Sequence, residues 1–111
     1  MTENRYQAKL IKRLKHDLPG CMVLKQDANY LQGIPDLLIL RGEHWAALEV
    51  KQNAKAEHQP NQDWYVTQMN AMSFARFIYP ENEEDILHEL REQFGLEGET
   101  CVPKSERILV A

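Results

Sequence analysis

Asp36, Glu49 and Lys51 are the residues whose types and spacing could carry chemistry. Two carboxylates that are forced together repel each other, and each becomes harder to ionise unless a cation lies between them. A divalent metal ion would remove that repulsion, and an amine beside the pair would bring a further positive charge to the same spot. The sequence therefore predicts a cation site if the fold brings these three side chains together.

The elements that must position them are two predicted strands joined by a tight hairpin. Residues 33–40 and 45–51 are mostly apolar runs bounded by turn formers, which is typical of strands. Between them, Gly42-Glu43 suits a two-residue type II′ turn, in which the flanking residues Arg41 and His44 pair. Any two residues that face each other across these strands then have numbers that add up to 85.

This register brings the acidic residues together. It places Asp36 directly opposite Glu49, with side chains about 5 Å apart. Strand alternation puts Lys51 on the same face as Glu49. Leu48 and Val50 then point to the other face, into the predicted core. We therefore expect two acids and an amine to converge on one surface of the sheet.

The motif resembles the signature of the PD-(D/E)xK nuclease superfamily, and it looks most like the VRR-NUC branch. Pro35-Asp36 and the later run Glu49-Val50-Lys51 carry the resemblance, which covers roughly residues 2 to 90. Further positions that match are Glu3, Gln7, Gly33 and Gln62. The resemblance implies an α/β restriction-endonuclease-like core in the order αβββαβ, with a mixed central sheet flanked by helices.

Hydrophobic patterning is compatible with that order. An amphipathic helix is predicted over residues 2–17, a strand over 21–26, a helix over 61–73, a strand over 75–79 and a final helix from Asn82. We expect one domain over residues 1–111, with a core of about residues 2–94 and a tail of 95–111.

The resemblance also implies roles for individual residues. The implied catalytic residues are Asp36, Glu49, Lys51, Gln62 and Glu3. The implied ligands of Mg²⁺ or Mn²⁺ are Asp36, Glu49, the main-chain carbonyl of Val50, and Glu3 for a second metal or its waters. Lys51 would orient or deprotonate the attacking water, and Gln62 would bind that water or a phosphate oxygen. Two of these residues also have ordinary structural explanations: Glu3 as an acid favoured in a first helical turn, and Gln62 as a simple helix-start residue.

Charge is distributed unevenly along the chain, whose formal net charge is −4. Residues 1–55 hold nine Lys or Arg and six Asp or Glu, a balance of +3, whereas residues 56–111 hold four and eleven, a balance of −7. The N-terminal half is therefore the predicted DNA-binding face. Basic residues that could contact phosphates are Arg5, Lys9, Lys12, Arg13, Lys15 and, in a polar stretch further along, Lys55. A charged helix face is also often merely solvated.

The function that the resemblance implies is a metal-dependent endodeoxyribonuclease. Small stand-alone proteins that look like this chain act as dimers on branched DNA, so we expect a homodimer that resolves Holliday junctions. Ile108–Val110 is a candidate edge strand for the pairing. Three alternatives remain: a flap or fork nuclease, a restriction-like nuclease that cuts plain duplex, and a catalytically inactive DNA-binding module.

Other features argue against several classes of protein. No charged and then apolar leader occurs, and no apolar run approaches eighteen residues, so we expect no membrane partner and a cytoplasmic location. The family resemblance implies a bacterial cell or a phage-encoded origin. Cys21 and Cys101 are too few and too far apart for a zinc site, and reduced thiols are expected.

Overall fold

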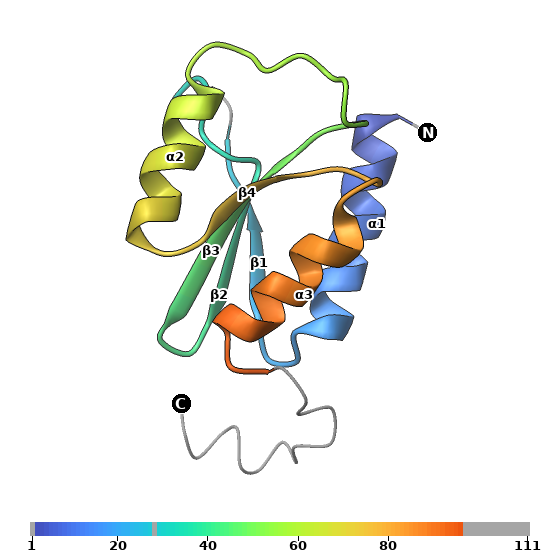
Figure 1. Cartoon of the computed structure of the whole chain (residues 1–111), viewed down its shortest axis with the longest axis vertical. Coiled ribbons are helices and arrows are strands. Elements are labelled where there is room, and N and C mark those ends of the chain that lie inside the picture. The colour runs from blue at the N-terminus through green and yellow to red at the C-terminus, as the bar shows by residue number, and fades with distance from the viewer. Residues whose placement is uncertain (1, 28, 97–111) are drawn as a thin grey trace.

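Figure 1 shows a computed structural model of the chain, which describes residues 2–27 and 29–96. The elements in chain order are α1 (Glu3–Asp17), β1 (Met22–Lys25), β2 (Leu37–Arg41), β3 (His44–Val50), α2 (Gln62–Met72), β4 (Ala75–Ile78) and α3 (Glu83–Gln93). This is the predicted αβββαβ order followed by the predicted final helix. The predicted strand at Ile108–Val110 and the tail from residue 97 lie outside the described residues.

The four strands form one mixed sheet in the order β1-β2-β3-β4. The first three are antiparallel, and β4 runs parallel to β3. Arg41 pairs with His44, so the predicted register of the hairpin is confirmed. Gly42 has a φ of 59°, and Asn61 is the only residue other than glycine with a positive φ in the described part of the chain. The hairpin therefore has the positive φ at its first turn position alone, as a type II′ turn requires.

One face of the sheet is covered by α1 and α3, and the main core lies there (Figure 1). Thr2 caps α1 by accepting a hydrogen bond from the main-chain N–H of Arg5 at 3.2 Å. Apolar periodicity predicts inward positions for Tyr6, Leu10, Ile11, Leu14, Leu18, Leu48, Val50, Ile86, Leu87, Leu90 and Phe94. All of these are buried except Ile11, which is half-buried, and Leu37 and Ile39 of β2 are buried with them. This core lies on the face of β3 opposite Glu49.

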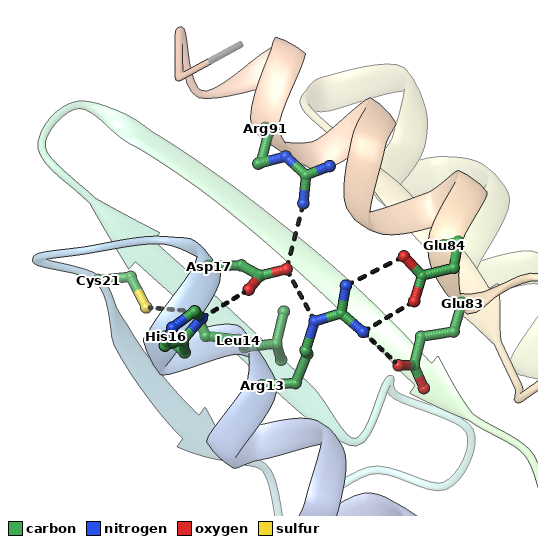
Figure 2. Close-up of polar contacts among 8 residues, drawn as sticks. All are labelled: Arg13, Leu14, His16, Asp17, Cys21, Glu83, Glu84 and Arg91. Carbon is green, nitrogen blue, oxygen red and sulfur yellow. Dashed lines mark hydrogen bonds and ion pairs between the residues drawn. The ribbon is translucent and has the colours of Figure 1, made fainter. Parts of the chain in front are cut away.

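Ion pairs join α1 to α3 along the rim of this core (Figure 2). Arg13 contacts Asp17 at 2.9 Å, Glu83 at 3.1 Å and Glu84 at 2.8 Å. Arg91 on α3 contacts the same carboxylate of Asp17 at 3.1 Å. The acidic start of α3 thus faces a guanidinium from α1, a contact between residues about seventy positions apart in sequence.

The opposite face of the sheet is covered only in part, because α2 packs on β3 and β4. Apolar periodicity predicts Tyr65, Val66, Met69 and Met72 as the buried face of this helix, but the prediction for Met72 is wrong, since this side chain is 73% exposed. The stripe that faces the sheet contains Gln62, Val66 and Met69, and at helical spacing it continues to Ser73, whose hydroxyl donates to the main-chain oxygen of Trp45. No helix in the described part of the chain is long and apolar enough to cross a membrane.

Candidate active site

Asp36 and Glu49 meet where β2 begins and β3 ends. Asp36 directly precedes β2, and its Oδ2 accepts a hydrogen bond of 2.9 Å from the main-chain N–H of Val50. Glu49 is only 2% exposed, on the face of β3 opposite the core residues Leu48 and Val50. The two carboxyl groups lie within hydrogen-bonding reach of each other. The hairpin register therefore opposes the two acids as the sequence predicts.

Burial makes both acids hard to ionise. It raises the pKa of Asp36 above the ordinary value of an aspartate, although the hydrogen bond from Val50 acts in the opposite direction. Burial, followed by the negative charge of Asp36, raises the pKa of Glu49 to about 8. The nearby Lys51 amine lowers this pKa but does not cancel the effect. In the absence of another cation, the pair holds a proton more tightly than exposed carboxylates would.

Lys51 and Gln62 complete a connected polar cluster beside Glu49. Lys51 Nζ lies 3.8 Å from Glu49 Oε2 and donates to Gln62 Oε1 at 2.7 Å. Gln62 Nε2 in turn donates to Glu49 Oε2 at 2.8 Å. The amide of Gln62 thus bridges the acid and the amine, and all three side chains are buried. The structure brings together Asp36, Glu49, Lys51 and Gln62, four of the five residues that the sequence predicts for the site.

Gly33 explains how the first turn of α2 is brought to this cluster. Its φ is +95°, and a Cβ at this position would lie 2.7 Å from the Cβ of Asn61 and 2.8 Å from the main-chain oxygen of Pro60. Both distances are shorter than ordinary contacts, so a side chain would push the segment before Gln62 away. The glycine of the Gly-Ile-Pro-Asp run therefore allows the strand entry and the start of α2 to touch.

Glu3 lies at the N-terminal end of α1 and is exposed. Its negative charge is a small contribution to the raised pKa of Glu49, after burial and the charge of Asp36. Among the described residues, however, no three His, Cys, Asp or Glu side chains gather closely enough to hold a metal ion. The predicted role of Glu3 as a metal ligand therefore stays a prediction.

The donor set nevertheless fits a hard divalent cation. Glu49 Oε1 is buried, and no N–H or O–H donor in the described part of the chain reaches it. A buried oxygen without a partner is destabilising, as is a buried carboxylate beside a half-buried one. A dication that takes oxygen ligands and retains several waters would relieve both. Asp36, Glu49 and the adjacent main-chain carbonyl of Val50 are the groups that could hold it.

The predicted DNA-contacting residues are in different situations. Lys9, Lys12 and Lys55 are exposed. The guanidinium of Arg13 contacts three carboxylates, which leaves few of its N–H donors for phosphates, and its contact with DNA stays a prediction. Its pairing could not be predicted from α1 alone, because two of its partners belong to α3.

Main-chain atoms in the loop between β3 and α2 are the part of the site that sequence reasoning missed. The carbonyl oxygen of Glu57 accepts a 2.9 Å hydrogen bond from Lys51 Nζ. The main-chain N–H of Gln59 donates to Gln62 Oε1 at 2.7 Å. No residue type signals such contacts, because any residue except proline at position 59 could supply these atoms.

Among solved structures, this chain is similar to a protein described as "VRR_NUC domain protein". The TM-score is 0.63 at 15% sequence identity, over 86% of this chain and 90% of that chain. At this identity the likeness concerns the fold, so the chain has a VRR-NUC-like α/β fold. A scan of the sequence against protein-family models finds no match, and a comparison with curated proteins finds no relative.

Proposed function

We propose that this protein is a metal-dependent endodeoxyribonuclease that hydrolyses phosphodiester bonds. The observation that carries the proposal is the opposed pair of half-buried Asp36 and buried Glu49, whose raised pKa values and unpartnered oxygen favour a bound cation. Lys51 and Gln62 lie directly beside the pair. The VRR-NUC-like fold supports the same conclusion, since a protein described by that domain name shares it.

The bound metal would be Mg²⁺ or Mn²⁺, which polarises a phosphoryl oxygen and makes a bound water more acidic. Asp36, Glu49 and the Val50 carbonyl would hold it. Lys51 has three N–H donors, of which two go to Glu57 and Gln62, so the third can meet a water or a phosphate oxygen. The Gln62 bridge fixes the amine relative to the acid, which limits the positions that an attacking water can take.

We propose a branched DNA, most specifically the four-way Holliday junction, as the substrate. Two symmetric cuts require two sites, and the described chain has one pair of opposed carboxylates, so a homodimer would supply the second. The surface proposed for a second copy is the edge strand β1, where Met22 and Leu24 are 56% and 41% exposed on the half of the sheet that α2 leaves open. Exposed Lys9 and Lys12 would contact phosphates.

A cleavage panel tests the proposal. Matched four-way junction, flap, fork and linear duplex DNAs would be incubated with the protein and Mg²⁺ or Mn²⁺, and light scattering would give the oligomeric state. We expect paired incisions in the junction by a dimer. Preferential cleavage of flaps or forks by a monomer would overturn the junction assignment, and free cutting of plain duplex would favour a restriction-like nuclease. Binding without cleavage under both metals would overturn the nuclease and favour a DNA-binding module.

A further inference from the structure

The loop between β3 and α2 closes over the amine of the site. Lys51 is 5% exposed, although residues 57–59 of the loop that covers it are themselves exposed. Its cover consists of main-chain groups: the Glu57 carbonyl binds Lys51 Nζ, and the Gln59 N–H binds Gln62 Oε1. Figure 1 shows this loop arching over the end of the sheet from β3 to α2. The positions of Lys51 and Gln62 thus depend on where the main chain of residues 57–59 lies.

His58, between those two main-chain contacts, fastens the loop to the sheet. Its ring stacks on Phe77 of β4 with centroids 3.9 Å apart and planes inclined by 10°. Phe77 is the residue that pairs with Glu49 across β3 and β4, so its side chain lies on the same face of the sheet as the acidic pair. The ring of His58 therefore rests on the strand neighbour of Glu49 itself.

His58 contacts both Phe77 and Asp63, and the stack on Phe77 is the stronger of these two contacts. Its Nδ1 also lies 2.7 Å from Asp63 Oδ1, but the Asp63 side chain is 74% exposed, and ion pairs between exposed groups contribute little. Aromatic stacking adds stabilisation beyond the area that it buries. Glu57 and Gln59 are exposed, so their side chains provide little packing to hold the loop.

A separate contact holds only the first part of the loop. The main-chain N–H of Ala54 donates to Glu81 Oε2 at 3.2 Å, and the N–H groups of Lys55 and Ala56 bond back to Asn53. These bonds leave residues 57–59 to be held by other contacts. His58 is the side chain of this segment that reaches β4.

We propose that His58 is a positioning residue: by stacking on Phe77 it holds the main chain of residues 57–59 against Lys51 and Gln62. The proposal rests on the proposed nuclease function for its effect on catalysis. Loss of the ring frees the loop, so that Lys51 loses the Glu57 carbonyl and Gln62 loses the Gln59 N–H. Both side chains then sample other rotamers, whereas Asp36 and Glu49 remain fixed by the sheet. The rate of the chemical step falls, and the affinity for metal and DNA is kept.

The test combines a structural and a kinetic measurement on three variants. Hydrogen exchange of the Gln59 N–H, followed by NMR without metal, reports the loop contact, and steady-state and single-turnover cleavage of junction DNA report kcat and KM. His58→Ala should speed the exchange and lower kcat roughly 10- to 100-fold with KM little changed. His58→Phe keeps a stacked ring and removes Nδ1, so it should restore both quantities to near the wild-type values.

The control is His88→Ala, because His88 also pairs with a carboxylate, Glu92 at 3.1 Å, but lies on α3. It should leave both measurements at wild-type values. Unchanged Gln59 exchange in His58→Ala, an unchanged kcat despite faster exchange, or failure of His58→Phe to restore either quantity would each overturn the proposal. A wild-type protein that cleaves no DNA would refute the nuclease function instead, and the exchange measurement would still decide whether His58 holds the loop.

Discussion

Acidic side chains cluster in two parts of this molecule with opposite electrostatic results. At the junction of α1 and α3, Asp17, Glu83 and Glu84 surround Arg13, and Arg91 also contacts Asp17. Between β2 and β3, Asp36 and Glu49 face each other, and the Lys51 amine lies 3.8 Å from Glu49 Oε2. Burial opposes ionisation at both places. At Asp17, hydrogen bonds with His16 and Arg13 and the charges of Arg13 and Arg91 outweigh burial and lower the pKa, whereas the pKa of Glu49 is raised.

The difference separates acids whose charge the fold neutralises from acids that it leaves with too little positive charge. Carboxylates with several cationic partners inside the protein stay ionised without a ligand. An acid pair that lacks such partners destabilises the metal-free protein when it ionises, which is the property expected of a binding site. The number of cations that reach each acid therefore tells the two clusters apart.

The largest expected effect comes from removing the negative charge of Glu49, which faces Asp36. Glu49→Gln keeps the side-chain shape but loses a charged metal ligand worth several kcal/mol in the transition state, so cleavage should fall about 1,000-fold or more. Glu84→Gln, in the group of acids around Arg13, is the matched control and should cleave like the wild type. Cleavage assays on both folded variants measure this. Normal turnover by Glu49→Gln would place the site elsewhere.

Lys51→Ala tests whether the amine acts on the substrate or on the metal. Since the proposed role of Lys51 is to act on the water and the phosphate and not to hold the metal, we expect cleavage to fall roughly 100- to 1,000-fold while metal still binds. Calorimetric titration with Mn²⁺, run beside Glu49→Gln, separates the two roles. If Lys51→Ala loses metal affinity as severely as Glu49→Gln, the amine has been assigned the wrong role.

The pH dependence of stability should differ in sign between the clusters. The folded protein raises the pKa of Glu49 from an ordinary 4.5 to about 8, so its contribution to stability is full below pH 4.5 and is lost as the pH rises through 8. At about 1.4 kcal/mol per pKa unit, this loss amounts to a few kcal/mol. Asp17, with a lowered pKa, instead loses its contribution as the pH falls.

Urea unfolding with EDTA at pH 5, 6.5 and 8 measures the Glu49 effect. The difference in unfolding free energy between Glu49→Gln and the wild type should grow in favour of the variant as the pH rises. A difference that is independent of pH between 5 and 8 would mean that Glu49 ionises like an exposed glutamate.

The smallest effect is expected at Arg13, whose ion pairs should contribute to stability and not to cleavage. Arg13→Gln should lower the unfolding free energy by about 1 kcal/mol, because its partners are partly exposed. Cleavage and the salt dependence of DNA binding should not change. Lys12 is one residue away and exposed. Lys12→Gln should instead reduce the salt slope, which is the slope of the logarithm of the DNA-binding constant against the logarithm of the salt concentration, by about one. A weaker salt slope in Arg13→Gln would place Arg13 on the DNA-binding face.

Much of the candidate site follows from the sequence, because its geometry is local. Gly42-Glu43 sets the hairpin register, and the register alone opposes Asp36 and Glu49 and puts Lys51 on the same face. The period of the apolar residues likewise predicts the buried stripe of α1 and of α3. The prediction for Met72 was wrong because periodicity does not fix which side chain of the last turn of a short helix faces the sheet. The packing of α2 on β3 and β4 decides this.

What the sequence by itself determined is thus the acid pair, the amine and an α/β domain, since turn geometry and side-chain periodicity act within a few residues; the order of the elements was implied by the family resemblance. Tertiary structure alone decided which acids have cationic partners: Arg13 meets Glu83 and Glu84 only because α1 packs beside α3. It also brought Gly33 against Asn61 and laid the Glu57 carbonyl over Lys51. Such contacts join segments through space and often use main-chain atoms, which every residue carries, so no pattern of residue types announces them.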